Sequence, residues 1–263
     1  MDKAIYLNCL TCFDAALPIE GTGIDNQNPL FLHGFLDIAA VVSVVSLDEF
    51  CGPSAESRLQ DLAWVGPRAC RHQEIVERVM RYTPVLPAHF GTLFSSFENL
   101  EKLLHKNYDN IRRFLDHMKD KEEWSVKVLL DREKAKEERI IKALAREAEQ
   151  LASLTPGKRY FQEQRIRTDV EKELNSWLKE VCEKTMRDLN SFAADFYDRK
   201  SILHGVNGSD GVIIQNWAFL VPQIVKMDFQ ARIDLTNADL SPQGLVFELS
   251  GPWPPYSFSP DVK

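Results

Sequence analysis

Apolar residues in the first half of the chain follow two different periods. Short alternating or β-branched runs predict strands, and stripes with steps of three and four predict helices. Between the two predicted helices lies a segment with two prolines, which must be extended because proline is disfavoured inside a helix. The predicted elements are strands over residues 4–10, 30–35 and 38–45, a helix over much of 55–81 with an interruption at Gly66-Pro67, an extended segment over 84–94, and a helix from Ser95 or Ser96 to about Lys119.

The second half of the chain shows the same two periods in a recognisable order. The predicted elements are a strand over 124–130, a long helical pair, strands over 202–206 and 212–219 on either side of an Asn207-Gly208 turn, a helix from Pro222 to about Leu235 with Ile224, Val225, Phe229 and Ile233 facing inward, and a strand over 245–249. This βαββαβ order is that of a ferredoxin-like domain, with its first helix replaced by a long helical extension.

The predicted fold class is therefore α+β, with two domains in one chain of 263 residues. Residues 1–120 form the N-terminal α+β domain, for which the pattern gives no standard element order. Residues 121–250 form the ferredoxin-like domain, with the helical extension at about 131–200. Residues 251–263 form a tail, rich in proline and aromatic residues, that is expected to pack on the body of the protein.

Charge is concentrated in the helical extension. Residues 120–200 hold 18 Lys and Arg against 18 Asp and Glu, while the rest of the chain carries the whole net charge of −7. Such a dense and balanced block is typical of exposed helices with i,i+4 ion pairs. Thr155-Pro156-Gly157 divides it into two helices. The block is either a solvated helical pair with one packed seam or an arm that binds a partner through that seam.

Composition excludes several classes of protein. A net charge of −7 argues against nucleic-acid binding, which needs a basic surface. No apolar run is long enough to predict a membrane span, and the first residues do not resemble a secretory signal. Five cysteines, an odd and modest number, fit a reduced compartment. We therefore expect a protein made in the cytoplasm.

The chain contains few candidates for chemistry. Cys9 and Cys12 have the C-x-x-C spacing, which leaves a thiol redox protein or a metal-binding protein as the alternative function. No helix pattern follows them, and packing cysteines are the other interpretation. The glycine-rich stretch over 205–211 is followed by a predicted strand, whereas a phosphate loop requires a helix. No catalytic set stands out, so we expect an interaction protein that is not an enzyme and has no cofactor.

Two unusual segments have no catalytic interpretation. One runs from Tyr82 to Phe94 and contains Pro84-Val85-Leu86-Pro87. The other is the tail, whose conspicuous residues are Trp253, Pro254, Pro255, Tyr256 and Phe258. Proline-rich backbone loses little entropy when it becomes ordered, and each aromatic ring can bury a large area. The tail is therefore predicted to be structural, with an exposed aromatic hook for a partner as the alternative.

These two segments carry a resemblance to a known family. Together with the opening Ile5-Tyr6-Leu7, the stretch Pro84-Val85-Leu86-Pro87-Ala88-His89-Phe90-Gly91-Thr92 and the closing Gly251-Pro252-Trp253-Pro254-Pro255-Tyr256-Ser257-Phe258 resemble the gas vesicle protein F/L family (GvpF/GvpL). The three matches lie at the start, middle and end of the chain, so the resemblance covers nearly all of it. The Trp-Pro-Pro tail resembles a cyanobacterial F-type member more than an L-type member, and both types stay open.

The resemblance implies a function that the residue patterns did not indicate. Family members are non-enzymatic accessory or minor structural proteins of the gas vesicle. They are thought to bind the small hydrophobic shell protein and to limit its aggregation during nucleation. The expected partners are this shell protein and other gas vesicle accessory proteins, and the expected location is the gas vesicle. The resemblance assigns no catalytic, cofactor or metal residue.

Overall fold

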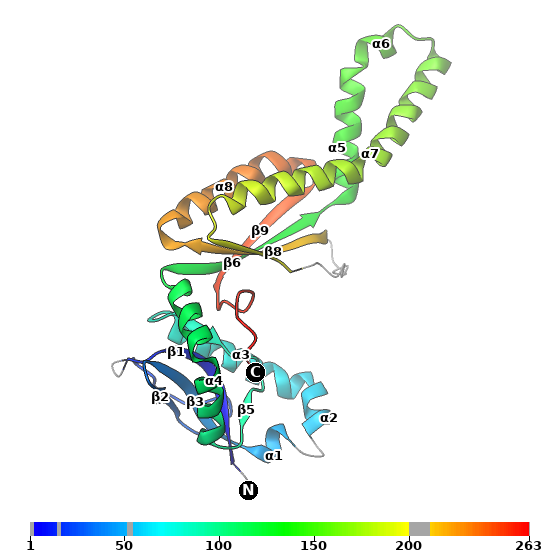
Figure 1. The fold of residues 1–263 in the computed structure, drawn as a ribbon. Coiled ribbons are helices and arrows are strands. Elements are labelled where there is room, and N and C mark those ends of the chain that lie inside the picture. The colour runs from blue at the N-terminus through cyan, green and yellow to red at the C-terminus, as the bar shows by residue number, and fades with distance from the viewer. Residues whose placement is uncertain (1–2, 15–16, 52–54, 200–210, 263) are drawn as a thin grey trace. The chain divides into compact units, whose positions relative to one another are not determined.

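The structure, a computed structural model, describes residues 3–14, 17–51, 55–199 and 211–262. The chain forms two compact units, Met1–Glu122 with Trp253–Lys263, and Glu123–Pro252. Each unit contains one sheet with helices packed on it, so the predicted α+β class is confirmed. The predicted domain boundaries at 120/121 and 250/251 stay predictions. Figure 1 shows the elements of both units.

The sheet of the first unit is built around β1. Its strand order is β2-β3-β1-β4, and β5 pairs with β1 as well. β1 is antiparallel to β3 from Lys3↔Ser46 to Cys12↔Ile38, with a register shift between Leu7 and Cys9. Both strands are buried along most of their length, which requires cover on both faces of the sheet. The strands are β1 (Lys3–Cys12), β2 (Leu30–Phe35), β3 (Ile38–Ser46), β4 (Val85–Pro87) and β5 (Leu93–Phe94).

Helices α3 and α4 provide this cover. α3 packs its buried apolar stripe against Cys9, and α4 reaches Cys12 through Arg112, whose Nη1 lies 3.2 Å from the Cys12 Sγ. Because Cys9 and Cys12 are three residues apart on one strand, their side chains point to opposite faces. The two helices therefore cover opposite faces of the sheet. The helices are α1 (Leu47–Phe50), α2 (Ala55–Gln60), α3 (Leu62–Met80) and α4 (Phe97–Met118).

The predicted interruption at Gly66-Pro67 is wrong, whereas the predicted cap of α4 is confirmed. The break lies at Asp61, which caps α3 by accepting a hydrogen bond from the Ala63 N–H at 2.9 Å. Pro67 lies in the second turn of α3, where it removes one backbone hydrogen bond but does not end a helix that is buried along its later turns. At α4, the Asn99 N–H donates to the Ser96 Oγ at 3.3 Å.

The second unit shows the predicted order of strand, helical pair, two strands, helix and strand. Its sheet has the order β7-β8-β6-β9, so β8 lies between β6 and β7. This order agrees with a βαββαβ domain, and the ferredoxin-like classification stays an interpretation. The elements are β6 (Lys121–Leu130), α5 (Arg132–Arg146), α6 (Ala148–Ala152), α7 (Pro156–Asn190), β7 (Asp195–Asp198), β8 (Val212–Pro222), α8 (Lys226–Leu240) and β9 (Leu245–Trp253), with short 3₁₀ turns at Gln223–Val225 and Ser241–Gln243.

The core of the second unit lies between its sheet and one layer made by α7 and α8 (Figure 1). Rings from the strands meet a ring from α8, as in the pair Phe219–Phe229, whose centroids are 5.4 Å apart. Towards its start, α7 leaves the sheet and pairs with α5 instead. There the two helices and α6 enclose a small apolar cluster of their own, made of Ile140, Leu151, Ile166 and Val170.

The predicted extent of the helical extension, about 131–200, is too long at its end. α7 ends at Asn190, and Phe196 and Tyr197 lie on β7. The apolar pattern continues past Asn190 because Phe196 is paired with Phe219 across the sheet, and a core-facing strand residue cannot be distinguished from one more helical step by hydrophobicity alone. The predicted strand over 202–206 and the Asn207-Gly208 turn lie outside the described residues.

Gly244 offers a test of how tightly the second unit is built. Its φ is +82°, and a Cβ there would lie 2.6 Å from the Asp131 carbonyl oxygen and 2.8 Å from the Ala135 nitrogen. Since both are backbone atoms, we expect Gly244→Ala to lower the free energy of unfolding of this unit by about 2 kcal/mol or more. Urea denaturation of the full chain measures the change.

The control is Gly157→Ala in the first turn of α7, where an added Cβ meets no atom within 4 Å. That substitution is expected to leave stability unchanged or to raise it by up to about 1 kcal/mol. Equal effects of the two substitutions would show that the backbone around Gly244 can accommodate a Cβ.

Candidate functional site

The two unusual segments of the sequence meet in the first unit. The chain after Pro252 returns to this unit, where Pro254 and Pro255 are buried. The ring of Tyr256 stacks on His89, with centroids 6.4 Å apart. The tail is therefore seated on the proline-rich segment that includes β4.

His72, on the buried side of α3, is at the centre of this contact. Its Nδ1 lies 3.0 Å from the Oη of Tyr6 on β1. Its Nε2 lies 3.0 Å from the Ala88 carbonyl oxygen and 3.2 Å from the Oη of Tyr256. One imidazole thus joins a helix, the central strand, the proline-rich segment and the tail.

The partners of His72 determine its protonation. A carbonyl oxygen only accepts hydrogen bonds, so Nε2 carries the proton that is donated to Ala88. Nδ1 then accepts from the hydroxyl of Tyr6, which itself accepts from the Gly91 N–H at 3.1 Å. Burial lowers the pKa of His72 from 6.5 to about 4, because a charged imidazole would lose its hydration. The ring is therefore neutral at neutral pH.

The two tyrosines of this network are also held neutral. Burial raises the pKa of Tyr256 to about 12 and raises that of Tyr6 still further. A general acid or base works best with a pKa near the operating pH. Each group of the network is shifted away from that range, so the arrangement is suited to holding segments together and not to transferring protons.

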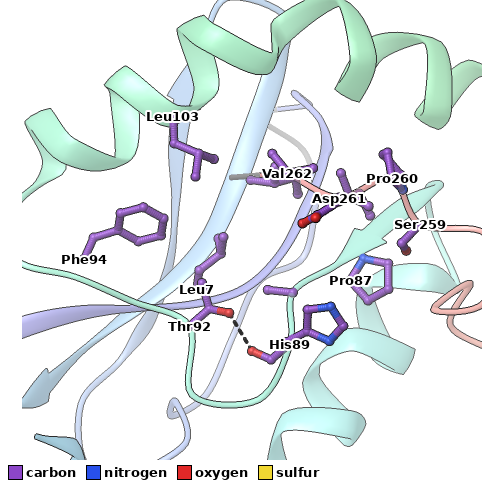
Figure 2. A pocket seen from close by; sticks show the side chains of 13 residues that line it. Leu7, Pro87, His89, Thr92, Phe94, Leu103, Ser259, Pro260, Asp261 and Val262 are labelled. Carbon is purple, nitrogen blue, oxygen red and sulfur yellow. Dashed lines mark hydrogen bonds between the residues drawn. The ribbon is translucent and has the colours of Figure 1, made fainter.

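A small apolar cavity adjoins the network (Figure 2). Its volume is about 90 Å³, and it opens between β1, the segment after β4, α4 and the last residues of the tail. His89 borders it, and the backbone carbonyl of His89 accepts a hydrogen bond from the Thr92 hydroxyl at 2.7 Å. The lining is mainly apolar: Leu7, Leu10, Leu86, Pro87, Ala88, Phe94, Leu103, Pro260 and Val262, with His89, Thr92, Ser259 and Asp261.

The five tail residues singled out in the sequence differ in burial. Pro254 and Pro255 are buried, Tyr256 and Phe258 are half-buried, and Trp253 keeps 38% of its surface exposed. The structural role of the tail stays a prediction. Sequence reasoning assigned no role to His72, whose only signal was its place within the predicted helix over 55–81.

Cys9 and Cys12 do not form a redox pair in this geometry. Their side chains point to opposite faces of β1, and neither is at a helix N-terminus. Cys9 is fully buried, and burial raises the pKa of its thiol, which is the reverse of what a reactive cysteine requires. Within the described residues, no group of three or more His, Cys, Asp and Glu side chains could hold a metal ion.

Comparison with known proteins identifies the family. A family model described as "Gas vesicle synthesis protein GvpL/GvpF" matches residues 4–260. This chain belongs to the GvpL/GvpF family. Gas vesicle protein L of Streptomyces sp. (strain CB03234) is 28% identical over 263 residues, which cover 98% of this chain and 93% of the relative. Gas vesicle protein L1 of Halobacterium salinarum is 23% identical over 274 residues, which cover 98% of this chain and 90% of the relative.

Two solved structures of the GvpL/GvpF family share the fold. The crystal structure of GvpF from Anabaena sp. PCC7120 has a TM-score of 0.70 at 16% identity and covers 99% of this chain and 98% of its own. GvpF from Microcystis aeruginosa has a TM-score of 0.68 at 16% identity, with 98% and 99% covered. These structures show the fold alone and the named relatives above are L proteins, so the F-type assignment stays a prediction.

The family confirms two expectations from the sequence. The resemblance carried by the proline-rich segment and the tail is correct, and so is the association with gas vesicles. Across the described part of the GvpL/GvpF chain, no helix has the length and apolar character needed to cross a membrane.

Tyr256 allows the structural role of the tail to be tested. Tyr256→Phe removes the hydroxyl next to His72 but keeps the ring on His89, and should destabilise the first unit by about 1 kcal/mol. Tyr256→Ala also removes the ring and should cost about 2–4 kcal/mol. Hydrogen exchange of the β1 amides in the full chain measures both.

The matched control is Trp253→Ala, for which a smaller effect is expected because this ring is 38% exposed. If the Tyr256 variants leave exchange unchanged while binding to a gas vesicle partner is lost, the hook interpretation is correct.

His72 predicts a pH dependence. Its folded pKa of about 4 lies below the ordinary 6.5, so the unfolded chain binds more protons between these values. The stability associated with the neutral ring is fully present above pH 6.5 and decreases as the pH falls towards 4. Between pH 7 and pH 5 the loss should be about 2 kcal/mol.

The measurement is urea denaturation of the wild type and of His72→Gln at both pH values. Glutamine cannot titrate, and all other ionisable groups are shared, so the difference between the two pH slopes isolates His72. Identical slopes would mean that this imidazole is not held neutral.

Proposed function

We propose that this chain is a non-enzymatic accessory or minor structural protein of the gas vesicle, and that it supports assembly by binding the hydrophobic shell protein and limiting its aggregation. The observation that carries the proposal is the family match over residues 4–260. The relatives are named as gas vesicle proteins, and the partner is an inference from the resemblance. Other gas vesicle accessory proteins are further candidate partners.

The chemistry of the candidate site supports a binding function. The pKa values of His72, Tyr6 and Tyr256 are shifted away from neutral pH, where a general acid or base works best. What the site offers instead is an apolar cavity with a framework fixed by hydrogen bonds. Ligand sites are commonly preformed, mostly apolar hollows with a few polar groups at the rim.

We assign the contact with the shell protein to this cavity. At about 90 Å³ it can accept an apolar side chain and not a larger ligand. Leu103 of α4 borders it and is half-buried. A second apolar surface is the edge-to-face pair Tyr160–Phe161 near the start of α7, where the two rings are 59% and 74% exposed. These two surfaces can be separated by mutation.

Co-expression with the shell protein tests the proposal. The fraction of shell protein that stays out of the insoluble pellet is measured without this chain, with the wild type, with Leu103→Glu and with Tyr160→Gln/Phe161→Gln. The wild type should raise that fraction, and Leu103→Glu should abolish the gain because a carboxylate cannot enter an apolar contact without losing its hydration. The aromatic double variant should retain it.

Thermal melting of both variants provides the control for folding. Equal aggregation with and without the chain would disprove the binding function. If Leu103→Glu retains the gain and Tyr160→Gln/Phe161→Gln abolishes it, the contact lies on the helical extension instead.

A further inference from the structure

α8 is apolar on two opposite sides. Phe229 and Ile233 are buried against the sheet, as predicted. The outer side carries a second stripe, with successive steps of three, four, four and three residues, formed by Ile224, Met227, Ala231, Leu235 and Ala238. The prediction that Ile224 faces inward is wrong, because Ile224 precedes α8 in a 3₁₀ turn and is 92% exposed.

This outer stripe is continuous. Steps of three and four place its members next to one another along a helix, and its length is about 21 Å at 1.5 Å per residue. Met227 is 73% exposed and Leu235 is 63% exposed. Single exposed apolar residues are ordinary on protein surfaces, but a row of them four turns long indicates an interaction surface.

Acidic residues flank the stripe. Asp228 is four residues after Ile224, Asp239 is four residues after Leu235, and Asp234 is three residues after Ala231. Helical spacing puts each carboxylate beside the apolar row. All three aspartates are exposed, and in the described part of the chain none of them forms an ion pair with a basic side chain.

The basic residues of α8 do not neutralise this rim. The Nζ of Lys226 lies 5.1 Å from the centre of the Trp124 ring. Arg232 donates from Nη2 to the Oδ2 of Asp188 on α7 at 2.5 Å. Both side chains are directed to neighbours in the second unit, so the outer side of α8 is an apolar stripe with an acidic border.

We propose that the outer stripe of α8 docks a basic amphipathic helix of another protein. An apolar stripe on that helix would pack along the five residues, and lysines or arginines beside it would face Asp228, Asp234 and Asp239. Packing of two helices along apolar stripes buries a large area, and the charges at the rim select the partner and its orientation. This inference goes beyond the proposed function, because it lies in the second unit and does not require the shell protein as the partner.

Two other occupants are disfavoured by charge. A second copy of this chain would bring three more aspartates against the same three, and the chain already carries a net charge of −7. Anionic membrane surfaces attract helices whose polar side is rich in lysine and arginine, and this rim is acidic. A basic partner is the occupant whose charge complements the surface.

The probe is a labelled helical peptide of about 18 residues, long enough to span the stripe. It is composed of leucine and lysine, with the leucines at helical spacing. A leucine–glutamate peptide of the same spacing is its counterpart. Fluorescence anisotropy with the full chain measures binding of both, and we expect the leucine–lysine peptide to bind at least about tenfold more tightly.

Two triple variants test the two parts of the surface. Ile224→Gln/Met227→Gln/Leu235→Gln and Asp228→Asn/Asp234→Asn/Asp239→Asn should each weaken binding of the leucine–lysine peptide by about tenfold. The matched control, Glu133→Gln/Glu137→Gln/Glu149→Gln, removes the same amount of charge from exposed positions on α5 and α6. It should change binding by less than about twofold.

Three results would overturn the proposal. They are equal binding of the two peptides, equal weakening by the control variant, and a dimer of the wild type in sedimentation that the glutamine triple variant converts to monomer. The last result would mean that a second copy covers the stripe. Tests of the shell protein contact use other residues, so failure here leaves the proposed function untouched.

Discussion

The first unit depends on one buried imidazole. His72 is hydrogen-bonded to groups 66, 16 and 184 residues away along the chain, and these groups come from the central strand, the proline-rich segment and the tail. The bonds to Ala88 and Tyr256 require a proton on Nε2, and the bond from Tyr6 also requires an unprotonated Nδ1. Protonating Nδ1 would remove the acceptor for Tyr6, and removing the ring would leave a buried carbonyl without its donor. The contacts that seat the tail therefore converge on a single residue, and protonating it would break the link to the central strand.

The same network holds side by side in space the two segments that identify the family. The stretch from Ala88 to Thr92 supplies the carbonyl to His72 and the N–H to Tyr6, and Tyr256 closes the network from the other end of the chain. Gly91 has a φ of +83°, a conformation that residues with a side chain rarely adopt. This conformation occurs where the Gly91 N–H donates to Tyr6. The motif residues thus meet a geometric requirement, and the same geometry frames the apolar cavity.

Much of the fold follows from local patterns, while the site does not. The strands other than β7 and the cap at Ser96 were predictable, because alternation, β-branched runs and capping residues act within a few positions. The end of α7 was not predictable. Phe196 enters the core from β7, but its spacing from Leu189 and Phe192 is the spacing that a continuing helix would have. The network around His72 was not predictable either, because its partners become neighbours only after the sheet and its two helical layers have formed.

Ile224 was predicted to face inward because residues 222–240 can be assigned two helical phases. Residues 222–240 contain two apolar stripes, and either phase alone describes an amphipathic helix. The sheet can bury only one side of α8, and the rings of Phe219 and Phe229, 5.4 Å apart, fix which side that is. The second stripe is then left outside with its aspartates. Two apolar stripes on one helix therefore indicate a candidate interaction surface from sequence alone. The core buries one stripe, and the other is either covered by another molecule or exposed to water. The acidic border narrows that choice, since it makes the uncovered stripe selective for a basic partner.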